Sequence, residues 1–90
     1  MVSLDMAKKY LRVDSSDDDE FIQGLITTSV QLCENVTRKN REILANYKSL
    51  SQTAILYAVG YLYEHREDAD HNDLLVTLRS LLFVIREEIF

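Results

Sequence analysis

Five acidic residues lie close together near the start of the chain, and they are its first candidates for metal chemistry. Hard divalent cations prefer several carboxylate oxygens as ligands. The cluster lacks the central glycine and the terminal glutamate of a calcium loop of the EF-hand type. Acidic side chains in the first turn of a helix are also favoured by the helix dipole. We therefore interpret the cluster as a helix start and predict no metal site; its members are Asp14, Asp17, Asp18, Asp19 and Glu20.

Histidine and cysteine, the other residues suited to metal binding or catalysis, are scarce. His65 and His71 are six residues apart, which is not a metal-ligand spacing, and we expect them at the solvated rim of the fold. Cys33 is the only cysteine, so an internal disulfide and a cysteine-based zinc site are excluded. It lies on the apolar side of a helical pattern and is expected to be buried. Because no glycine-rich phosphate or oxyanion loop is present, we expect no cofactor and no enzymatic activity.

The overall composition indicates a single all-α domain spanning residues 1–90. Apolar residues make up 47% of the chain, which is enough for a folded core. Proline is absent and only two glycines occur, so helix breakers are rare. The net charge of −5 argues against a general nucleic-acid binder, whose affinity comes from neutralising phosphates. The first residues lack the apolar core of a signal peptide, so we expect the protein to be made in a cytosol.

Hydrophobic periodicity predicts a small, compact bundle of about four helices. They are expected over residues 3–14, 17–37, 49–67 and 72–90, with a polar connection over 38–48 in which a helical turn is possible but not required. The fourth helix carries a clear apolar stripe: Leu74, Leu78, Leu81, Leu82, Ile85 and Ile89. Residues suited to capping precede each apolar pattern, namely Ser3, Asp17 with Glu20, Ser49 or Ser51, and Asn72.

The third predicted helix is central because residues 53–63 are apolar on nearly every side. Such a helix must be covered all round, either by the other helices or by another subunit. Tyr57 and Tyr61 share one face, Tyr63 lies on another, and Gly60 between them allows another helix to approach closely. The tyrosines are either a core rim whose hydroxyls reach water or part of a subunit interface, where tyrosine is enriched.

The basic residues gather after the second predicted helix, at Arg38, Lys39, Arg41 and Lys48. Cations at a helix C-terminus are favoured by the dipole, which is one sufficient explanation. A second explanation comes from the distribution of charge along the chain. The acidic residues Asp17, Asp18 and Asp19 precede this helix, and the basic residues follow it. Copies of such a molecule could associate head to tail, and a heterologous contact of this kind can close into a ring.

Several segments together resemble the head-tail connector proteins of tailed phages. Residues 3–14, SLDMAKKYLRVD, followed by an acidic run and FIQGLI, are similar to the opening of that family. Residues 54–67, AILYAVGYLYEHRE, resemble its central helix, and 78–86, LRSLLFVIR, resemble its closing helix. The order and spacing of these segments carry the resemblance, which is weakest over residues 37–50.

The resemblance implies a structural virion protein at the head-tail junction. Such a protein assembles as a ring of about a dozen copies below the portal, joins the capsid to the tail-completion protein and extends the DNA channel without binding DNA tightly. It implies no catalytic residue, no cofactor and no membrane. The runner-up interpretation is a small acidic regulatory or inhibitor module that binds a basic protein. For the connector we expect interface residues at Tyr57, Tyr61, Tyr63, Arg66, Arg79 and Arg86, together with the charged residues Asp17, Asp18, Asp19, Arg38, Lys39 and Arg41.

Overall fold

Six α-helices form the regular structure of the protein in a computed structural model that describes residues 1–67 and 70–87. No strand occurs in this part of the chain, so the all-α class is confirmed. Three of the predicted helices correspond to single helices of the structure, and the fourth is divided into two. A further short helix lies over residues 41–46, where a helical turn was possible but not required. The helices are α1 (Leu4–Leu11), α2 (Asp19–Thr37), α3 (Arg41–Asn46), α4 (Lys48–Glu64), α5 (Asn72–Leu81) and α6 (Phe83–Arg86).

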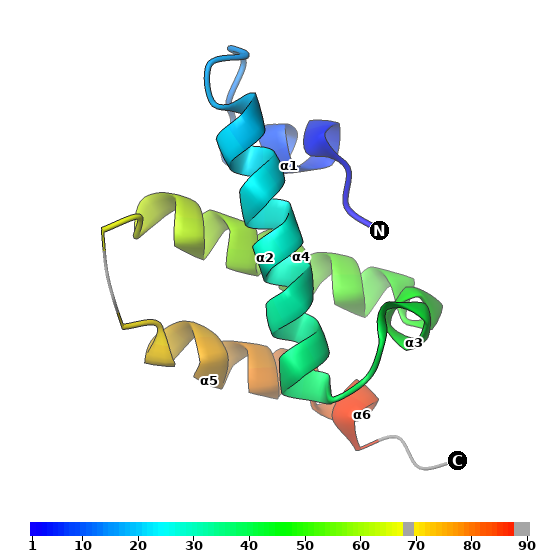
Figure 1. The fold of residues 1–90 in the computed structure, drawn as a ribbon. Helices are drawn as coiled ribbons and strands as arrows, with labels where there is room; N and C mark the ends of the chain where they lie inside the picture. The colour runs from blue at the N-terminus through cyan, green and yellow to red at the C-terminus, as the bar shows by residue number, and fades with distance from the viewer. Residues whose placement is uncertain (68–69, 88–90) are drawn as a thin grey trace.

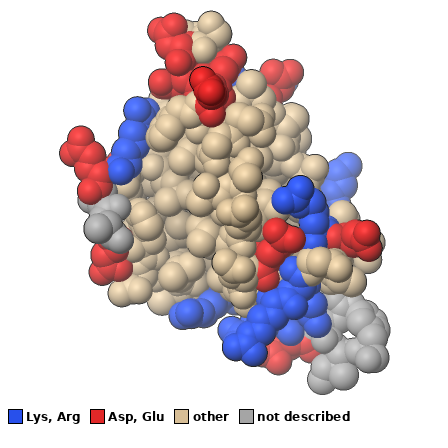
Figure 2. Space-filling view, in the orientation of Figure 1, with Lys and Arg blue, Asp and Glu red and all other residues tan. Residues whose placement is uncertain are grey.

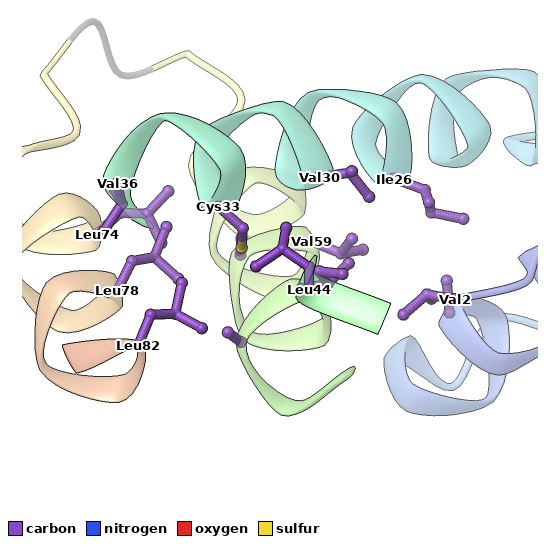
Figure 3. Close-up of a cluster of buried hydrophobic side chains, with 14 of the residues drawn as sticks. Val2, Ile26, Val30, Cys33, Val36, Leu44, Val59, Leu74, Leu78 and Leu82 are labelled. Atoms are coloured by element: carbon purple, nitrogen blue, oxygen red, sulfur yellow. The ribbon is translucent and has the colours of Figure 1, made fainter. Parts of the chain in front are cut away.

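The longest helix, α2, crosses in front of α4 and α5 and packs against both (Figure 1). α1 lies against α4 and the first half of α2, while α5 returns in the direction opposite to α4 at the other end of α2. Side chains from α2, α4 and α5 meet between these helices to form the core (Figure 3). The two ends of α2 are far apart in space and therefore have different neighbours. α1 lies beside its start, and α5 and α6 lie beside its end.

The apolar helix α4 is covered by four other helices of the same chain. α1, α2, α3 and α5 all pack against it. Its residues Ala54, Ile55, Ala58 and Val59 have no exposed surface. At least these four side chains need no second subunit to remove them from water. As a separate observation, no helix within the described residues is both long and apolar enough to cross a membrane.

The first two helices start and end at positions slightly different from those predicted. Ser3 caps α1 as expected, because its hydroxyl accepts a hydrogen bond from the Met6 amide at 3.2 Å. The helix ends at Leu11, earlier than predicted, because Arg12 adopts a left-handed conformation and its N–H bonds back to the preceding turn. Asp17 does not cap α2: the N-cap is Asp18, whose side chain makes no capping hydrogen bond.

The segment between α2 and α4 contains a helix where a polar connection was predicted. Asn40 caps α3, since its Oδ1 accepts a hydrogen bond from the Ile43 amide at 3.0 Å. α4 starts at Lys48, directly after α3, so Ser49 and Ser51 lie inside it and cap nothing. The Ser51 hydroxyl instead donates to the Leu44 carbonyl at 2.6 Å and ties α4 to α3. The predicted caps were wrong here because the short helix was not recognised.

The C-terminal part differs from a single long helix. Asn72 is the first residue of α5, not its cap, and the Asp70 side chain accepts its N–H at 3.0 Å. The helix is interrupted at Leu82 and resumes as α6. The predicted apolar stripe is nevertheless correct for the four residues that are fully buried, Leu74, Leu78, Leu82 and Ile85, while Leu81 is half-buried and Ile89 lies outside the described residues.

Candidate subunit interface

Charge is separated along α2, with acidic residues before its start and basic residues around its end. Figure 2 shows most of the acidic side chains at the top of the molecule and most of the basic ones toward the bottom, where some acidic side chains lie among them. The face between them is largely uncharged (Figure 2). The exposed residues along this length of α2 are neutral without exception from Gln23 onward: Gln23, Gly24, Thr27, Thr28, Gln31 and Asn35. The predicted charge split is therefore present on the folded surface, with a neutral helix face separating the two ends.

At the acidic end, two of the predicted interface residues have partners within the chain. Asp19 pairs with Lys8 of α1, with 2.7 Å between Oδ1 and Nζ. Asp18 lies 3.8 Å from the Arg66 guanidinium and accepts a hydrogen bond from the Tyr63 hydroxyl at 3.4 Å. The exposed carboxylates of Asp14, Asp17 and Glu20 form no ion pair with any described cation, and they are the ones available to a partner.

Arg66 organises an aromatic cluster at the same end of the molecule. Its guanidinium lies 4.8 Å from the centre of the Phe21 ring and 4.5 Å from that of Tyr63. Its Nε also donates to the Tyr63 carbonyl at 3.1 Å. The Phe21 side chain is 40% exposed beside Arg66, although it belongs to a helix whose other face is buried. Among the described residues, the ion-pair partner of Arg66 is Asp18, which is 48 positions away in the sequence.

The two histidines both contact Tyr61 and are half-buried, which places them at the rim of the fold. His65 stacks on the Tyr61 ring, with 4.1 Å between ring centres, and its Nδ1 lies 2.8 Å from the Tyr61 carbonyl oxygen. His71 meets the same ring edge-on at 6.0 Å. No group of three residues able to hold a metal ion occurs in the described parts of the chain.

The three predicted interface tyrosines line one groove. Tyr57, Tyr61 and Tyr63 are half-buried and pack against the core, so they share the features of a core rim. They also border a groove of about 630 Å³ together with Tyr10 and Arg12. Tyrosine and arginine side chains around a groove suit a protein contact. The structure is compatible with both sequence interpretations of the tyrosines.

The basic residues divide between two places, which sequence order did not indicate. Arg38 joins Arg79 and Arg86 around a groove of about 320 Å³, whose other lining residues are Leu32, Asn35, Val36 and Leu75. We call the groove that these three arginines line the arginine groove. Arg41 and Lys48 border a different groove, next to Met1 and Val2. Lys39 is half-buried and has an interaction within the chain. The spacing of Arg79 and Arg86, seven residues, could have placed them on one face; only the packing brings Arg38 to them.

Cys33 is buried in the core, as predicted from its position on the apolar side of α2. Burial, with a smaller contribution from the charge of Glu34, raises the pKa of its thiol from 9.0 to about 12. Nucleophilic chemistry requires the thiolate, which this environment disfavours. Cys33 is therefore part of the packing and is not suited to be a reactive group.

The model of a protein family, described as Phage gp6-like head-tail connector protein, matches residues 1–89. This match confirms the resemblance that the sequence segments carried. No curated protein and no solved structure shows a significant match to the chain. Because the family model covers nearly the whole sequence, the chain belongs to the Phage gp6-like head-tail connector proteins.

Proposed function

We propose that this head-tail connector acts as a ring of subunits below the portal, where it joins the capsid to the tail and extends the DNA channel. The observation that carries the proposal is the family match over residues 1–89. A connector of this class is a structural component of the phage virion, so its work is done by contacts with other virion proteins. The portal, the tail-completion protein and further copies of the chain are the partners we propose.

Two features of the surface support a subunit that meets neighbours on more than one side. The tyrosine groove, bordered by Tyr57, Tyr61 and Tyr63, lies near the acidic end, and the arginine groove lies at the other end of α2. Opposite charges at opposite ends favour a heterologous contact, which can close into a ring. We propose that the subunit contacts use residues from these regions, with Arg66 supporting the tyrosine side of the molecule.

The charge of the molecule supports a channel through which DNA passes without being held. The net charge of −5 per copy means that a ring of many copies carries a large negative charge. DNA phosphates are repelled by such a ring, and a low affinity for the passing polymer permits movement. The alternative, a small acidic inhibitor of a basic protein, receives no support from the family match.

Native mass spectrometry of the chain, alone and mixed with the portal protein encoded in the same phage genome, tests the proposal. We expect a closed ring of defined copy number in complex with the portal. In infected cells, loss of the gene is expected to leave filled or partly filled heads that carry no tail, and a plasmid copy is expected to restore joined particles. Normal virions formed without the protein would contradict the proposed role.

A further inference from the structure

The arginine groove brings the positive charges of three side chains together. Arg79 and Arg86 come from α5 and α6, and Arg38 is the residue that ends α2. None of the three forms an ion pair with a described carboxylate. Like charges around one small groove repel one another, so an anionic group bound there is stabilised. The side chains of Leu32, Val36 and Leu75 add an apolar surface to the same groove.

The chemistry of the groove favours carboxylates. A guanidinium group presents a planar fork of N–H donors that matches the two oxygens of a carboxylate. Three such groups beside apolar side chains suit a short acidic segment of protein that brings carboxylates and some apolar contact together. A polyanion such as DNA fits less well, because the remainder of the molecule is acidic and the net charge is −5.

An acidic segment with unpaired carboxylates is present on the same molecule, at the other end of α2. Asp14, Asp17 and Glu20 are exposed, and none has an ion-pair partner among the described residues. α2 has 19 residues, so about 28 Å of helix separates this segment from the arginine groove. The acidic and basic surfaces at the two ends of the molecule in Figure 2 therefore cannot meet within one copy.

We propose that the arginine groove of one copy binds the acidic segment of the next copy, with Asp14, Asp17 and Glu20 facing Arg38, Arg79 and Arg86. This contact rests on the proposed function, since it would join neighbouring subunits of the ring. Both the acidic side and the basic side of this contact differ from those expected from the sequence. Asp18 and Asp19 are occupied within their own chain, and Arg41 lies outside the groove.

A matched pair of charge-reversal variants tests the groove. The first variant is Arg79→Glu with Arg86→Glu, and the control is Arg41→Glu with Lys48→Glu, which changes the net charge equally at basic residues outside the groove. Sedimentation equilibrium at low salt measures self-association of the full chain, and circular dichroism verifies the helical fold. We expect the groove variant to weaken association at least about tenfold and the control to associate nearly as the native chain does.

A second variant, Asp17→Arg with Glu20→Arg, reverses the acidic segment and changes only exposed residues. Alone it is expected to associate as weakly as the groove variant. A mixture of the two variants restores opposite charges at every contact, so we expect association to return. If the groove variant by itself is poorly folded, the acidic-segment variant alone still tests the proposal, because it must lose association.

Three results would overturn the proposed contact. The first is a native chain that stays monomeric at about 1 mM in low salt. The second is equal association of the groove variant and the native chain. The third is micromolar binding of duplex DNA that the groove variant loses and the control keeps, which would assign the groove to phosphates. The second result would mean that the subunits contact each other elsewhere, and the ring proposal would still stand. Failure of the native chain both to self-associate and to bind the portal would count against the proposed function itself.

Discussion

Tyr10 of α1 lies directly over Gly60 of α4, so that a Cβ atom at Gly60 would come within 2.9 Å of the Tyr10 Cε2 atom. The sequence suggested that Gly60 permits the close approach of another helix, and the approaching group is this tyrosine of the same chain. Gly60 thus has a packing reason for its place inside a helix, where glycine is otherwise unfavourable.

The two glycines are expected to respond differently to alanine. Gly24 lies in the exposed face of α2 with nothing near its missing side chain, so Gly24→Ala is expected to stabilise the protein by about 0.5–1 kcal/mol. Gly60→Ala gains the same helix propensity but must displace the Tyr10 ring, so its gain is expected to be smaller or absent. Urea denaturation of dilute protein measures both. Adding Tyr10→Ala is expected to restore the gain at Gly60, and equal gains in the native background would contradict the packing argument.

Two buried serines provide a second contrast. The Ser51 hydroxyl donates to the Leu44 carbonyl, whereas the Ser29 hydroxyl is buried without a hydrogen-bond partner in the described residues. We expect Ser51→Ala to lower the free energy of unfolding by about 1 kcal/mol, because a buried carbonyl loses its donor. Ser29→Ala removes an unsatisfied polar group and is expected to raise it by about 1 kcal/mol. Thermal or urea unfolding shows whether each substitution raises or lowers the free energy of unfolding. Destabilisation by both substitutions would show that the Ser29 hydroxyl has a hydrogen-bond partner.

Arg66 is expected to stabilise the acidic end mainly through its contacts with the Phe21 and Tyr63 rings. Arg66→Ala should lower the free energy of unfolding by about 0.5–1 kcal/mol, the range for an exposed cation–π contact. Arg66→Lys should recover only part of this loss, because an ammonium group cannot stack as a planar guanidinium does. Asp18→Asn should have a smaller effect, since the ion pair is solvent-exposed. A double-mutant cycle with Phe21→Ala that yields no coupling would refute the ring contact.

The protein is expected to show no salt-sensitive binding to duplex DNA at physiological salt. Nucleic-acid affinity comes largely from cations that neutralise phosphates, and this chain has an excess of carboxylates. Fluorescence anisotropy of a labelled duplex, titrated with protein at several salt concentrations, measures the affinity and its salt slope. A micromolar complex that weakens with salt would be inconsistent with a channel that lets DNA slide.

Sequence periodicity predicted which faces of the long helices are buried. Cys33, Leu74 and Leu78 all lie in the core, because a helix that packs on one side repeats its apolar residues with a period near 3.6. Helix boundaries were less predictable, since caps depend on backbone geometry as well as residue type. Ser51 has the residue type of a cap, yet the preceding short helix gives it a different hydrogen bond.

The contacts that define the candidate site depend on tertiary packing, which local patterns do not contain. Asp18 and Arg66 are far apart in the sequence and meet because the start of α2 lies near the end of α4. Arg38 joins Arg79 and Arg86 for a similar reason: the end of α2 lies against α5 and α6. All of these residues were candidates from the sequence, but their grouping required the fold.

The raised pKa of the Cys33 thiol is expected to lower the free energy of unfolding at alkaline pH. Burial raises the pKa of the folded thiol to about 12 from an unfolded value of 9.0. Well below pH 9 the thiol is protonated in both states and adds no pH dependence. Between the two pKa values only the unfolded chain ionises, so the free energy of unfolding falls as the pH rises, by about 1 kcal/mol at pH 10. Cys33→Ala should lack this component, although it is less stable throughout because of the cavity left in the core. Denaturation curves of both proteins from pH 7 to pH 10 isolate the thiol, since other ionising groups are common to both; parallel pH profiles would contradict the raised pKa.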